Sequence, residues 1–464
     1  MTDATGGARP TSRRSYRPAE IVVALEHLDE VERELAYLGV KPDPARAARS
    51  RRLGLALLPL VDLEAAVARL PEPEHTAPQR PGRAPAGDGS ALDALMGALR
   101  RRFADRYAGW QPTMGKNRYV EGLEGLGEIG ANGDGAPRPA GDPPPPGGGE
   151  PRPDGEIGGG STRPLGEIGG GGGGGPRPLG EIGGGGRGGP RATDPPLHLA
   201  YDPQPGRRVE VGVLDTAMVA HPELVGRFVA DRPPLPYSGA APRPFFSGHA
   251  TFIAGLILHR APGAELHARS VLADADGTAS AWDVANKIVE FADSGVALLN
   301  LSLGCVTPDG EAPLVLQRAI ERLGPDTVVI AAAGNYPPPG AAVDRPLWPA
   351  ALPGVIAVGA YDPAAPGRPA EFSREQPWVR AMAPGVDVLS TYLDGPVSIA
   401  HRDADGGATE VRRRHFTGFA RWSGSSFAAA TVTGLVAAAT RPGQVSAREA
   451  AQALLTSPAG PTYL

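Results

Sequence analysis

The sequence contains a single cysteine, Cys305, and few aromatic residues, which make up 5% of the chain. One cysteine excludes an intramolecular disulfide, so the stability of the fold must come from packing. No run of roughly 18 consecutive apolar residues is present, which is the length that a membrane-spanning helix requires. The basic N-terminal residues are not followed by the apolar segment of a secretory signal peptide. We therefore expect a cytoplasmic protein, although secretion by another route would leave the same sequence pattern.

A strong excess of one charge is also missing, since 46 basic and 51 acidic residues give a formal net charge of -5. That balance gives no electrostatic reason to expect nucleic acid or an anionic membrane as a partner. No group of cysteine and histidine residues has the spacing of a zinc site. The sequence therefore predicts neither a nucleic-acid partner, nor a membrane partner, nor a metal.

Glycine and proline, with 65 and 52 residues, are abundant and are concentrated in residues 122–196. That segment has too few large apolar side chains to offset the entropy of ordering its backbone. It also contains a repeat, because RPLGEIGG at residues 163–170 recurs at residues 177–184. Such repeats are typical of flexible linkers, and the alternative is a string of Leu-Gly-Glu-Ile ligands or cleavage sites. We predict a disordered N-terminus at residues 1–17, a small domain at 18–120, a disordered linker at 121–198 and a second domain at 199–464.

The small N-terminal domain has alternating strand and helix patterns. Residues 20–26 are rich in β-branched side chains and predict a strand, and apolar residues then recur at helical spacing. Residues 53–60 predict a second strand, followed by a short helix that Asp62 can cap. A basic amphipathic helix is expected over about residues 91–107. These patterns predict a small α+β or mostly helical domain.

From Val209 onward, short apolar segments alternate with helical patterns. The apolar segments are continuous in valine, isoleucine and leucine, which is typical of strands buried on both faces of a parallel sheet. We therefore predict an α/β fold, in which a mainly parallel twisted sheet is flanked by helices. Reactive groups gather at the carboxyl ends of the strands in such sheets, and Asp215, Ser302 and Asn335 each end one of these segments.

Three separate segments supply the parts of a nucleophilic serine site. Asp215 ends a predicted strand, His249 begins a predicted helix, and Ser426 precedes a helix of small residues. A serine hydroxyl becomes a strong nucleophile when an imidazole removes its proton and a carboxylate orients that imidazole. Each residue alone is more often structural, but the chain order Asp, His, Ser is one of the known orders of this triad.

The residues around these positions resemble the subtilase family of serine proteases. The segments VGVLDT, GHATFIAGLI and SGSSFAAATVTGLVAA look like its aspartate, histidine and serine blocks, and the resemblance spans roughly residues 209–440. By that resemblance the second serine, Ser426, is the nucleophile. The segment AAAGN resembles the oxyanion-hole segment, which implies that Asn335 donates to the oxyanion. The family's peptide-binding segments imply these substrate-binding residues: Ser302, Leu303, Gly304, Ala333 and Gly334.

The sequence also departs from the family pattern. Ala217 and Ala250 stand where glycine is usual, and Phe252 stands where a histidine or a small residue is usual. A methyl group at a tight turn is tolerated where φ is negative, so we expect adjusted geometry and retained activity. Residues 397–421 are expected to form a surface loop, and Cys305 is expected to be a buried structural residue. Calcium is common in the family, but the acidic residues form no pattern that assigns it, and we expect no required cofactor.

These observations predict a serine endopeptidase that cuts peptides or proteins through an acyl-enzyme intermediate. The alternative is a catalytically weak or inactive subtilase fold that only binds peptides, which the filled chemical positions disfavour. Two roles stay open for the domain at residues 18–120. It is either a propeptide that inhibits the enzyme and is then cleaved off, as in relatives, or an adaptor that binds a protein partner.

Overall fold

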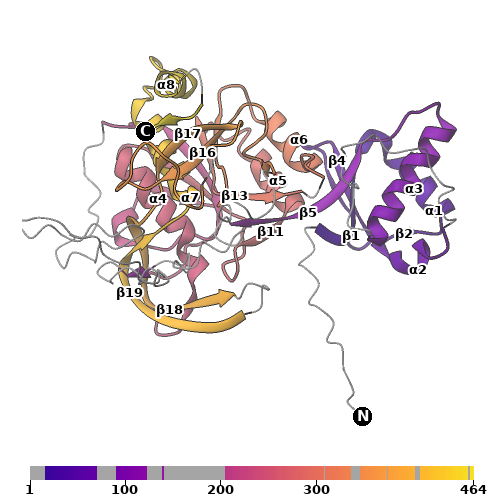
Figure 1. The fold of residues 1–464 in the computed structure, drawn as a ribbon, viewed down its shortest axis with the longest axis horizontal. Coiled ribbons are helices and arrows are strands. Elements are labelled where there is room, and N and C mark those ends of the chain that lie inside the picture. Colours follow the sequence, from indigo (N-terminus) through magenta and orange to yellow (C-terminus); the bar gives the residue numbers. More distant parts are fainter. Residues whose placement is uncertain are drawn as a thin grey trace, which may run out of the picture.

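The computed structural model describes residues 16–70, 90–122, 138–139, 204–307, 309–335, 345–373, 375–402, 408–457 and 460–464. Residues 1–15 and nearly all of the predicted linker at residues 121–198, including its repeats, lie outside the described residues. Figure 1 shows a smaller N-terminal part at one end of the molecule and a larger part that contains the C-terminus. Strand β5 (Met114–Gly122) runs from the smaller part into the larger one (Figure 1).

The N-terminal part combines an antiparallel sheet with helices. Its strands lie in the order β5-β1-β4-β2, and β3 also pairs with β4. The predicted strands and helices are confirmed, and the part is α+β rather than mostly helical. The elements are β1 (Tyr16–Ala24), α1 (Leu28–Tyr37), β2 (Lys41–Pro42), β3 (Ala48–Ser50), β4 (Leu55–Val61), α2 (Leu63–Val67) and α3 (Ala91–Arg106), followed by β5.

The second half of strand β1, residues 21–24, is apolar, and the N-terminal sheet is covered on both faces there. Ile21 and Val23 are buried in a core with α1 and α3. Val22 and Ala24, which point to the opposite face, are buried in a core that includes helices of the larger part. A strand with both faces buried has a continuous apolar sequence, which is the pattern seen at residues 21–24.

The predicted helix cap at Asp62 is wrong. Asp62 precedes α2, but its side chain makes no capping hydrogen bond, and its backbone is left-handed with φ 51° and ψ 34°. A capping residue needs an extended backbone so that its side-chain oxygen can reach the free N–H groups of the first turn. Ser90 has that conformation before α3, and its Oγ accepts a hydrogen bond of 3.2 Å from the N–H of Asp93.

The larger part contains the predicted parallel sheet. Its strands lie in the order β20-β17-β16-β14-β12-β7-β10-β8, and all neighbouring pairs are parallel. The strands are β7 (Glu210–Asp215), β8 (Phe228–Ala230), β10 (Glu265–Ser270), β12 (Leu298–Leu301), β14 (Val328–Ala332), β16 (Val355–Tyr361), β17 (Val379–Pro384) and β20 (Thr462–Tyr463). Three short strands outside this sheet are β11 (Thr278–Ser280), β13 (Leu303–Val306) and β15 (Leu347–Trp348).

Helices cover both faces of the parallel sheet, so the predicted α/β architecture is confirmed. Two buried cores lie on opposite sides of the sheet, one with α4 and α7 and the other with α5 and α6. Helix α7 is buried along nearly its whole length, because its small alanine and glycine residues allow close packing. The helices are α4 (His249–Arg260), α5 (Ala281–Val289), α6 (Leu314–Arg322), α7 (Ser425–Ala439) and α8 (Ala447–Leu454).

The surface loop expected at residues 397–421 is wrong, because this segment belongs to a long β-hairpin. Strands β18 (Val388–Arg402) and β19 (Ala408–Trp422) pair antiparallel and curve along one side of the molecule (Figure 1). The short strands β6 (Arg138–Pro139) and β9 (Arg243–Pro244) pair with the outer edges of this hairpin. Phe416, Ala420 and Trp422 are buried while His415 and Thr417 are exposed, so the strand pattern was present, but arginine and glycine residues obscured it.

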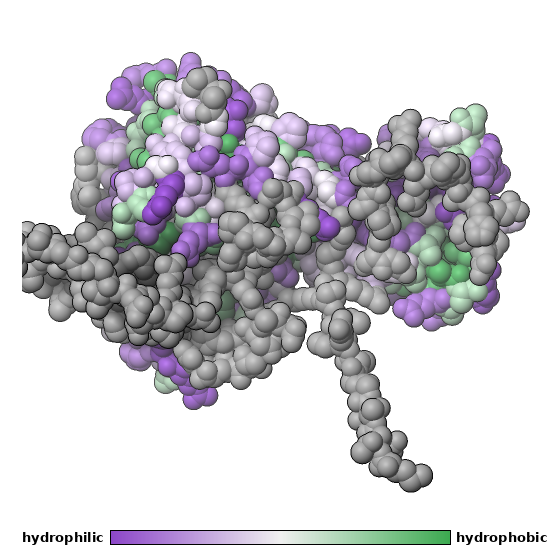
Figure 2. Space-filling model, viewed as in Figure 1, coloured by the Kyte–Doolittle hydropathy of each residue, from purple (hydrophilic) through white to green (hydrophobic). Residues whose placement is uncertain are grey.

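The described surface is mainly polar. Figure 2 shows hydrophilic residues over most of the visible described face, with hydrophobic residues confined to small areas. Among the described residues, no helix combines the length and the apolar character needed to cross a membrane.

Candidate active site

Asp215 and His249 form a buried pair at the carboxyl edge of the parallel sheet. Asp215 is the last residue of β7, and His249 is the first residue of α4. Nδ1 of His249 lies 2.7 Å from Oδ1 of Asp215, and the two residues are 0% and 1% exposed. The same carboxylate oxygen accepts a hydrogen bond of 2.7 Å from the N–H of Thr216. These contacts fix the imidazole so that its other nitrogen, Nε2, is the one that can exchange a proton with a substrate or nucleophile.

Aromatic rings surround the His249 imidazole. The ring centroids of Phe246, Trp422 and Phe427 lie 5.5 Å, 5.5 Å and 5.7 Å from that of His249. Phe252, which replaces the usual smaller residue, packs on Phe427 at 4.5 Å. Such an apolar enclosure keeps water away from the pair and strengthens the electrostatic interaction between its members.

Ser426 is the second residue of α7, so its hydroxyl lies at the positive end of a helix of 15 residues. Its Oγ is 3.5 Å from the carbonyl oxygen of Ser302, and the hydroxyl of Ser302 donates to the carbonyl of Ser426 at 3.1 Å. The helix therefore brings Ser426 directly against the end of β12 and the start of β13. Phe427, the next residue, contacts the ring of His249.

Asn335 lies beside the same helix terminus. Its Oδ1 accepts a hydrogen bond of 2.9 Å from the N–H of Ser425, and the hydroxyl of Ser425 accepts one of 3.2 Å from the N–H of Gly334. Gly334 has φ +111°, a conformation that side chains disfavour, so glycine is required at this turn. Ala333 is buried and donates its N–H to the carbonyl of Val358. The structure thus brings the predicted segment 333–335 to the N-terminus of α7.

The end of β5 fills the position between β11 and β13, beside Ser302 and Ser426, and this position is named the groove. This strand lies between β11 and β13 and pairs antiparallel with both. Gly122 is in register with Leu303, and Glu121 is in register with Gly304 and Thr278. The predicted substrate-binding residues 302–304 therefore form one wall, and β11 forms the other.

Two features of this groove were not predicted from the sequence. The wall formed by β11 is a short polar segment, and its pairing partner lies more than 150 residues away in the chain. Phe246 lies against Gly122, although nothing in its local sequence indicates a role in the groove. Pairing between distant segments leaves no periodic pattern in the local sequence. The only signal was the glycine at the end of β5, because glycine in a strand can mark a site where another group approaches the backbone closely.

The departures from the family pattern cause no backbone strain. Ala217 and Ala250 are absent from the described residues with positive φ, and Ala217 donates its N–H to Asp274 at 3.1 Å. Cys305 is 4% exposed, and burial raises the pKa of its thiol to about 12, as fits the expected structural role. Within the described ranges, no group of three or more histidine, cysteine or acidic residues is arranged to hold a metal.

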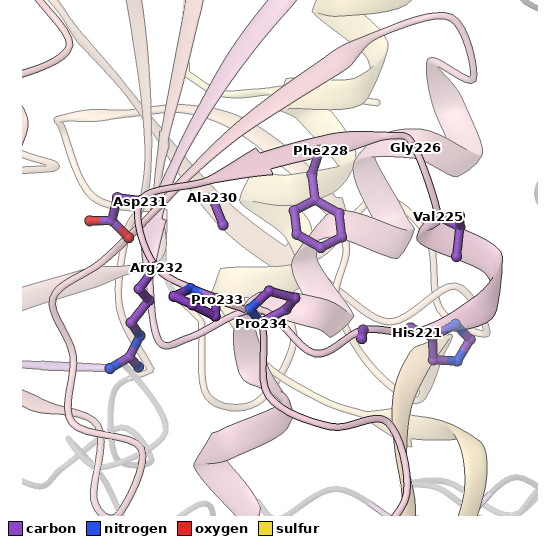
Figure 3. A pocket seen from close by; sticks show the side chains of 10 residues that line it. His221, Val225, Gly226, Phe228, Ala230, Asp231, Arg232, Pro233 and Pro234 are labelled. Atoms are coloured by element: carbon purple, nitrogen blue, oxygen red, sulfur yellow. The ribbon is translucent and has the colours of Figure 1, made fainter.

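A separate surface hollow of about 500 Å³ lies near β8. Figure 3 shows His221, Phe228, Asp231 and neighbouring residues around it. None of the residues that line this hollow belongs to the predicted triad, to the oxyanion segment or to the groove. The hollow is therefore distinct from the candidate active site.

Comparison with known proteins gives a consistent match. The sequence model of the subtilase family matches residues 206–462. The chain is 32% identical over 200 residues to the thermophilic serine proteinase of Bacillus sp. (strain AK1), covering 39% of this chain and 45% of that protein. It is 33% identical over 196 residues to subtilisin Savinase of Lederbergia lenta, covering 40% of this chain and 67% of that protein. The chain thus spans about half the length of the first two curated relatives, at 45% and 50%.

Among solved structures, the chain is similar to fervidolysin from Fervidobacterium pennivorans, a keratinolytic enzyme related to subtilisin. That match has 19% sequence identity and a TM-score of 0.49, and it covers 93% of this chain and 55% of that chain.

Proposed function

Because the chain belongs to the subtilase family, we propose that it is a serine endopeptidase in which Asp215, His249 and Ser426 form the catalytic triad. The observation that carries the proposal is the buried bond of 2.7 Å between Nδ1 of His249 and Oδ1 of Asp215. A buried carboxylate on one side of an imidazole stabilises the positive charge that forms when the other side accepts a proton. A module that only binds peptides has no need of this pair.

Hydrolysis then takes two steps. In the first, Nε2 of His249 removes the proton from Oγ of Ser426 while Oγ bonds to the carbonyl carbon of the substrate. The same nitrogen gives that proton to the departing amine as the C–N bond breaks, which leaves an ester on Ser426. In the second, a water gives a proton to Nε2 and attacks the ester carbon, and Oγ leaves with the proton. Asp215 takes no proton in either step and acts by orienting and stabilising the imidazole.

Asn335 is the proposed side-chain donor to the oxyanion of each tetrahedral intermediate. Its Oδ1 is engaged by the N–H of Ser425, so the NH₂ group is the donating side of the amide. The backbone N–H of Ser426, at the start of α7, is the proposed second donor. Donors that are already oriented need no reorganisation when the charge forms, and this makes them effective.

We further propose that residues 16–122 are an inhibitor that belongs to the same chain. Strand β5 takes the middle position between β11 and β13, so its backbone uses the hydrogen-bonding groups that an extended substrate would use. This occupation favours the propeptide role over the adaptor role. An adaptor has no reason to fill the groove beside Ser426.

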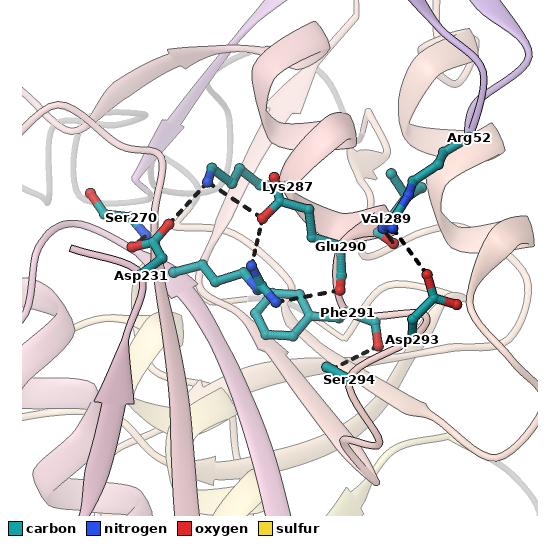
Figure 4. Close-up of polar contacts among 10 residues, drawn as sticks. Arg52, Asp231, Ser270, Lys287, Val289, Glu290, Phe291, Asp293 and Ser294 are labelled. Atoms are coloured by element: carbon teal, nitrogen blue, oxygen red, sulfur yellow. Dashed lines mark hydrogen bonds and ion pairs between the residues drawn. The ribbon is translucent and has the colours of Figure 1, made fainter.

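Side-chain contacts hold this inhibitor against α5 and nearby turns of the larger part. Arg52 donates to the carbonyl of Val289 and pairs with Asp293 at 3.1 Å (Figure 4). Arg118 pairs with Asp309 at 3.1 Å, and Asn117 accepts a hydrogen bond of 3.0 Å from the N–H of Trp282. A shared apolar core lies between these contacts. The interface therefore combines buried apolar area with specific polar contacts.

Labelling with a fluorophosphonate tests the triad. We expect the wild-type chain to be labelled at Ser426 and the Ser426→Ala variant to be unlabelled. Ser425→Ala is the matched control, because it removes the neighbouring hydroxyl and should keep the label on Ser426. A folded wild-type chain that has released its N-terminal fragment and is still not labelled, or a label on Ser425, would contradict the proposed nucleophile.

Mass spectrometry of the purified full chain tests the inhibitor. We expect the wild type to cut itself on the C-terminal side of β5 and the Ser426→Ala variant to remain intact. Peptidase activity should appear only after the cut, once the N-terminal fragment has left the groove. An uncut wild-type chain with full activity would show that residues 16–122 do not inhibit and would favour the adaptor.

A further inference from the structure

The ring of Phe246 fills the space beside two neighbouring glycines, Gly122 at the end of β5 and Gly277 just before β11. A Cβ atom built on Gly122 would lie 2.5 Å from Cε1 of Phe246, and one built on Gly277 would lie 2.6 Å from the same atom. The N–H of Gly122 donates to the carbonyl of Gly277 at 2.8 Å, so their backbones cannot move apart without losing this bond. The ring therefore leaves no room for a side chain at either position.

Phe246 cannot easily turn away from this place. It is 2% exposed, and its ring packs on Phe245 at 4.8 Å, on His249 at 5.5 Å and on Trp422 at 6.4 Å. Closely packed rings transmit a displacement to their neighbours instead of absorbing it. A shift of Phe246 would disturb the imidazole of His249, so the obstruction is a rigid one.

The register of β5 identifies the substrate residue that meets this ring. Gly122 is paired with Leu303, and in an antiparallel pair the next residue of a bound strand lies opposite Ser302. The carbonyl of Ser302 is 3.5 Å from Oγ of Ser426. In a substrate bound in the register of β5, the residue opposite Ser302 thus presents its carbonyl to the nucleophile. The residue in the place of Gly122 is the second one before the cleaved bond.

The obstruction is local to this one position. Two residues earlier on the same strand, the side chain of Val120 is 0% exposed and packs in a core with Trp282 and Leu303. The groove therefore accepts a branched apolar side chain at that position and excludes even a methyl group at Gly122. A uniformly narrow groove would exclude both.

We propose that Phe246 is a specificity-determining residue that restricts substrates to peptides with glycine at the second residue before the cleaved bond. This inference rests on the proposed peptidase function and adds its substrate class: extended, glycine-containing polypeptide segments. Forcing a methyl group into a packed site costs about 1–3 kcal/mol, which is roughly a 5-fold to 150-fold effect at 1.4 kcal/mol per factor of ten.

The first test measures amide hydrogen exchange in the uncut full chain, with Ser426→Ala as the parent. Gly122→Ala should speed exchange at the end of β5 by roughly 5-fold to 150-fold. Gly115→Ala is the matched control on the same strand, because its Cβ would make an ordinary contact of 3.4 Å with Leu314. In a Phe246→Leu background, Gly122→Ala should change the exchange rate at the end of β5 only a little. The proposal would be overturned if Gly122→Ala left the exchange rate unchanged. It would also be overturned if Gly122→Ala raised the exchange rate equally with Phe246 and with Leu at position 246.

The second test needs no variant of Phe246 and so does not depend on its folding. The wild-type full chain is incubated with a library of peptides from a digested proteome, and the cleaved bonds are mapped by mass spectrometry, with Ser426→Ala as the blank. Glycine two residues before most cleaved bonds supports the proposal. Cleavage without this preference overturns it and leaves the peptidase function intact. Absence of Ser426-dependent cleavage by a chain that has released its N-terminal fragment overturns both the peptidase function and the specificity that rests on it.

Discussion

The two parts of the molecule each bury a carboxylate, but they give it different partners. In the N-terminal part, Glu34 accepts hydrogen bonds of 2.8 Å and 2.7 Å from Arg102 and Arg106. In the larger part, Asp215 lies 2.7 Å from His249. A guanidinium stays protonated at every physiological pH, whereas an imidazole side chain is able to accept and release a proton. The two carboxylates are alike in burial and in distance to their partners, so the difference that we expect to matter for chemistry is whether the partner can exchange a proton.

Among the substitutions that test this comparison, Asp215→Asn should have the largest effect on kcat. The amide keeps the shape of the side chain but no longer stabilises the imidazolium, so we expect kcat to fall roughly 10,000-fold. The thermal unfolding temperature should change little. The assay is hydrolysis of a peptide cut by the wild type, together with thermal unfolding of both proteins. A variant that unfolds early but keeps its kcat would mean that the pair is structural, like that of Glu34.

A pair of asparagines sharpens the same comparison. Asn335 and Asn117 each accept a backbone N–H through Oδ1, but the NH₂ group of Asn117 donates to the carboxylate of Glu20 at 2.7 Å. We expect Asn335→Ala to lower kcat roughly 100-fold to 1,000-fold with a small change in KM, because the donor acts on the transition state. The Asn335→Asp variant keeps Oδ1 but loses the NH₂ donor, so its kcat should fall by a similar factor.

Asn117→Ala is the matched variant in the N-terminal part. It should leave kcat of the cut enzyme unchanged and weaken the docking of β5, measured as faster amide exchange in the uncut chain. Equal losses of kcat in the Asn335 and Asn117 variants would contradict the separate roles.

Glu34→Gln should affect stability alone. The substitution leaves Arg102 and Arg106 without a charged partner, but these side chains are 34% and 61% exposed, so water compensates part of the loss. We expect a loss of about 1–3 kcal/mol in the free energy of unfolding of the N-terminal part and an unchanged kcat. Denaturant unfolding followed by amide exchange resolves the two parts. An unchanged free energy of unfolding would show that the Glu34 carboxylate does not stabilise the N-terminal part.

The sequence predicted the larger part better than the groove. Strands β7, β14 and β16 are nearly continuous apolar segments, and Asp215 and Asn335 stand where such segments end, so fold and candidate residues could be read locally. The groove could not, because Gly122, Phe246 and Gly277 come from three distant segments and meet only through strand pairing. The hairpin of β18 and β19 was missed for a different reason. Its buried positions include Gly395 and Gly418 and its exposed positions include Arg413, and glycine and arginine are residue types typical of loops.

The smallest effect is a difference in how acid weakens the two parts. In the larger part, burial lowers the pKa of His221 below its ordinary value, although its bond to the carbonyl of Gly418 opposes this. The folded protein therefore favours the neutral imidazole. In the N-terminal part, burial alone would raise the pKa of Glu34, but the two arginines outweigh it and the net pKa is lowered. The folded protein there favours the carboxylate.

Both groups therefore stabilise the fold at high pH and lose that effect as pH falls, but in different windows. The unfolded chain binds a proton at His221 below about pH 6.5 and at Glu34 below about pH 4.3. In the Ser426→Ala parent, the difference in unfolding temperature between His221→Gln and the parent should shrink between about pH 7 and 5. The difference for Glu34→Gln should stay constant there and shrink only near pH 4. If both differences changed over the same pH range, the two parts would share one acid-labile element, and the contrast between their buried groups would fail.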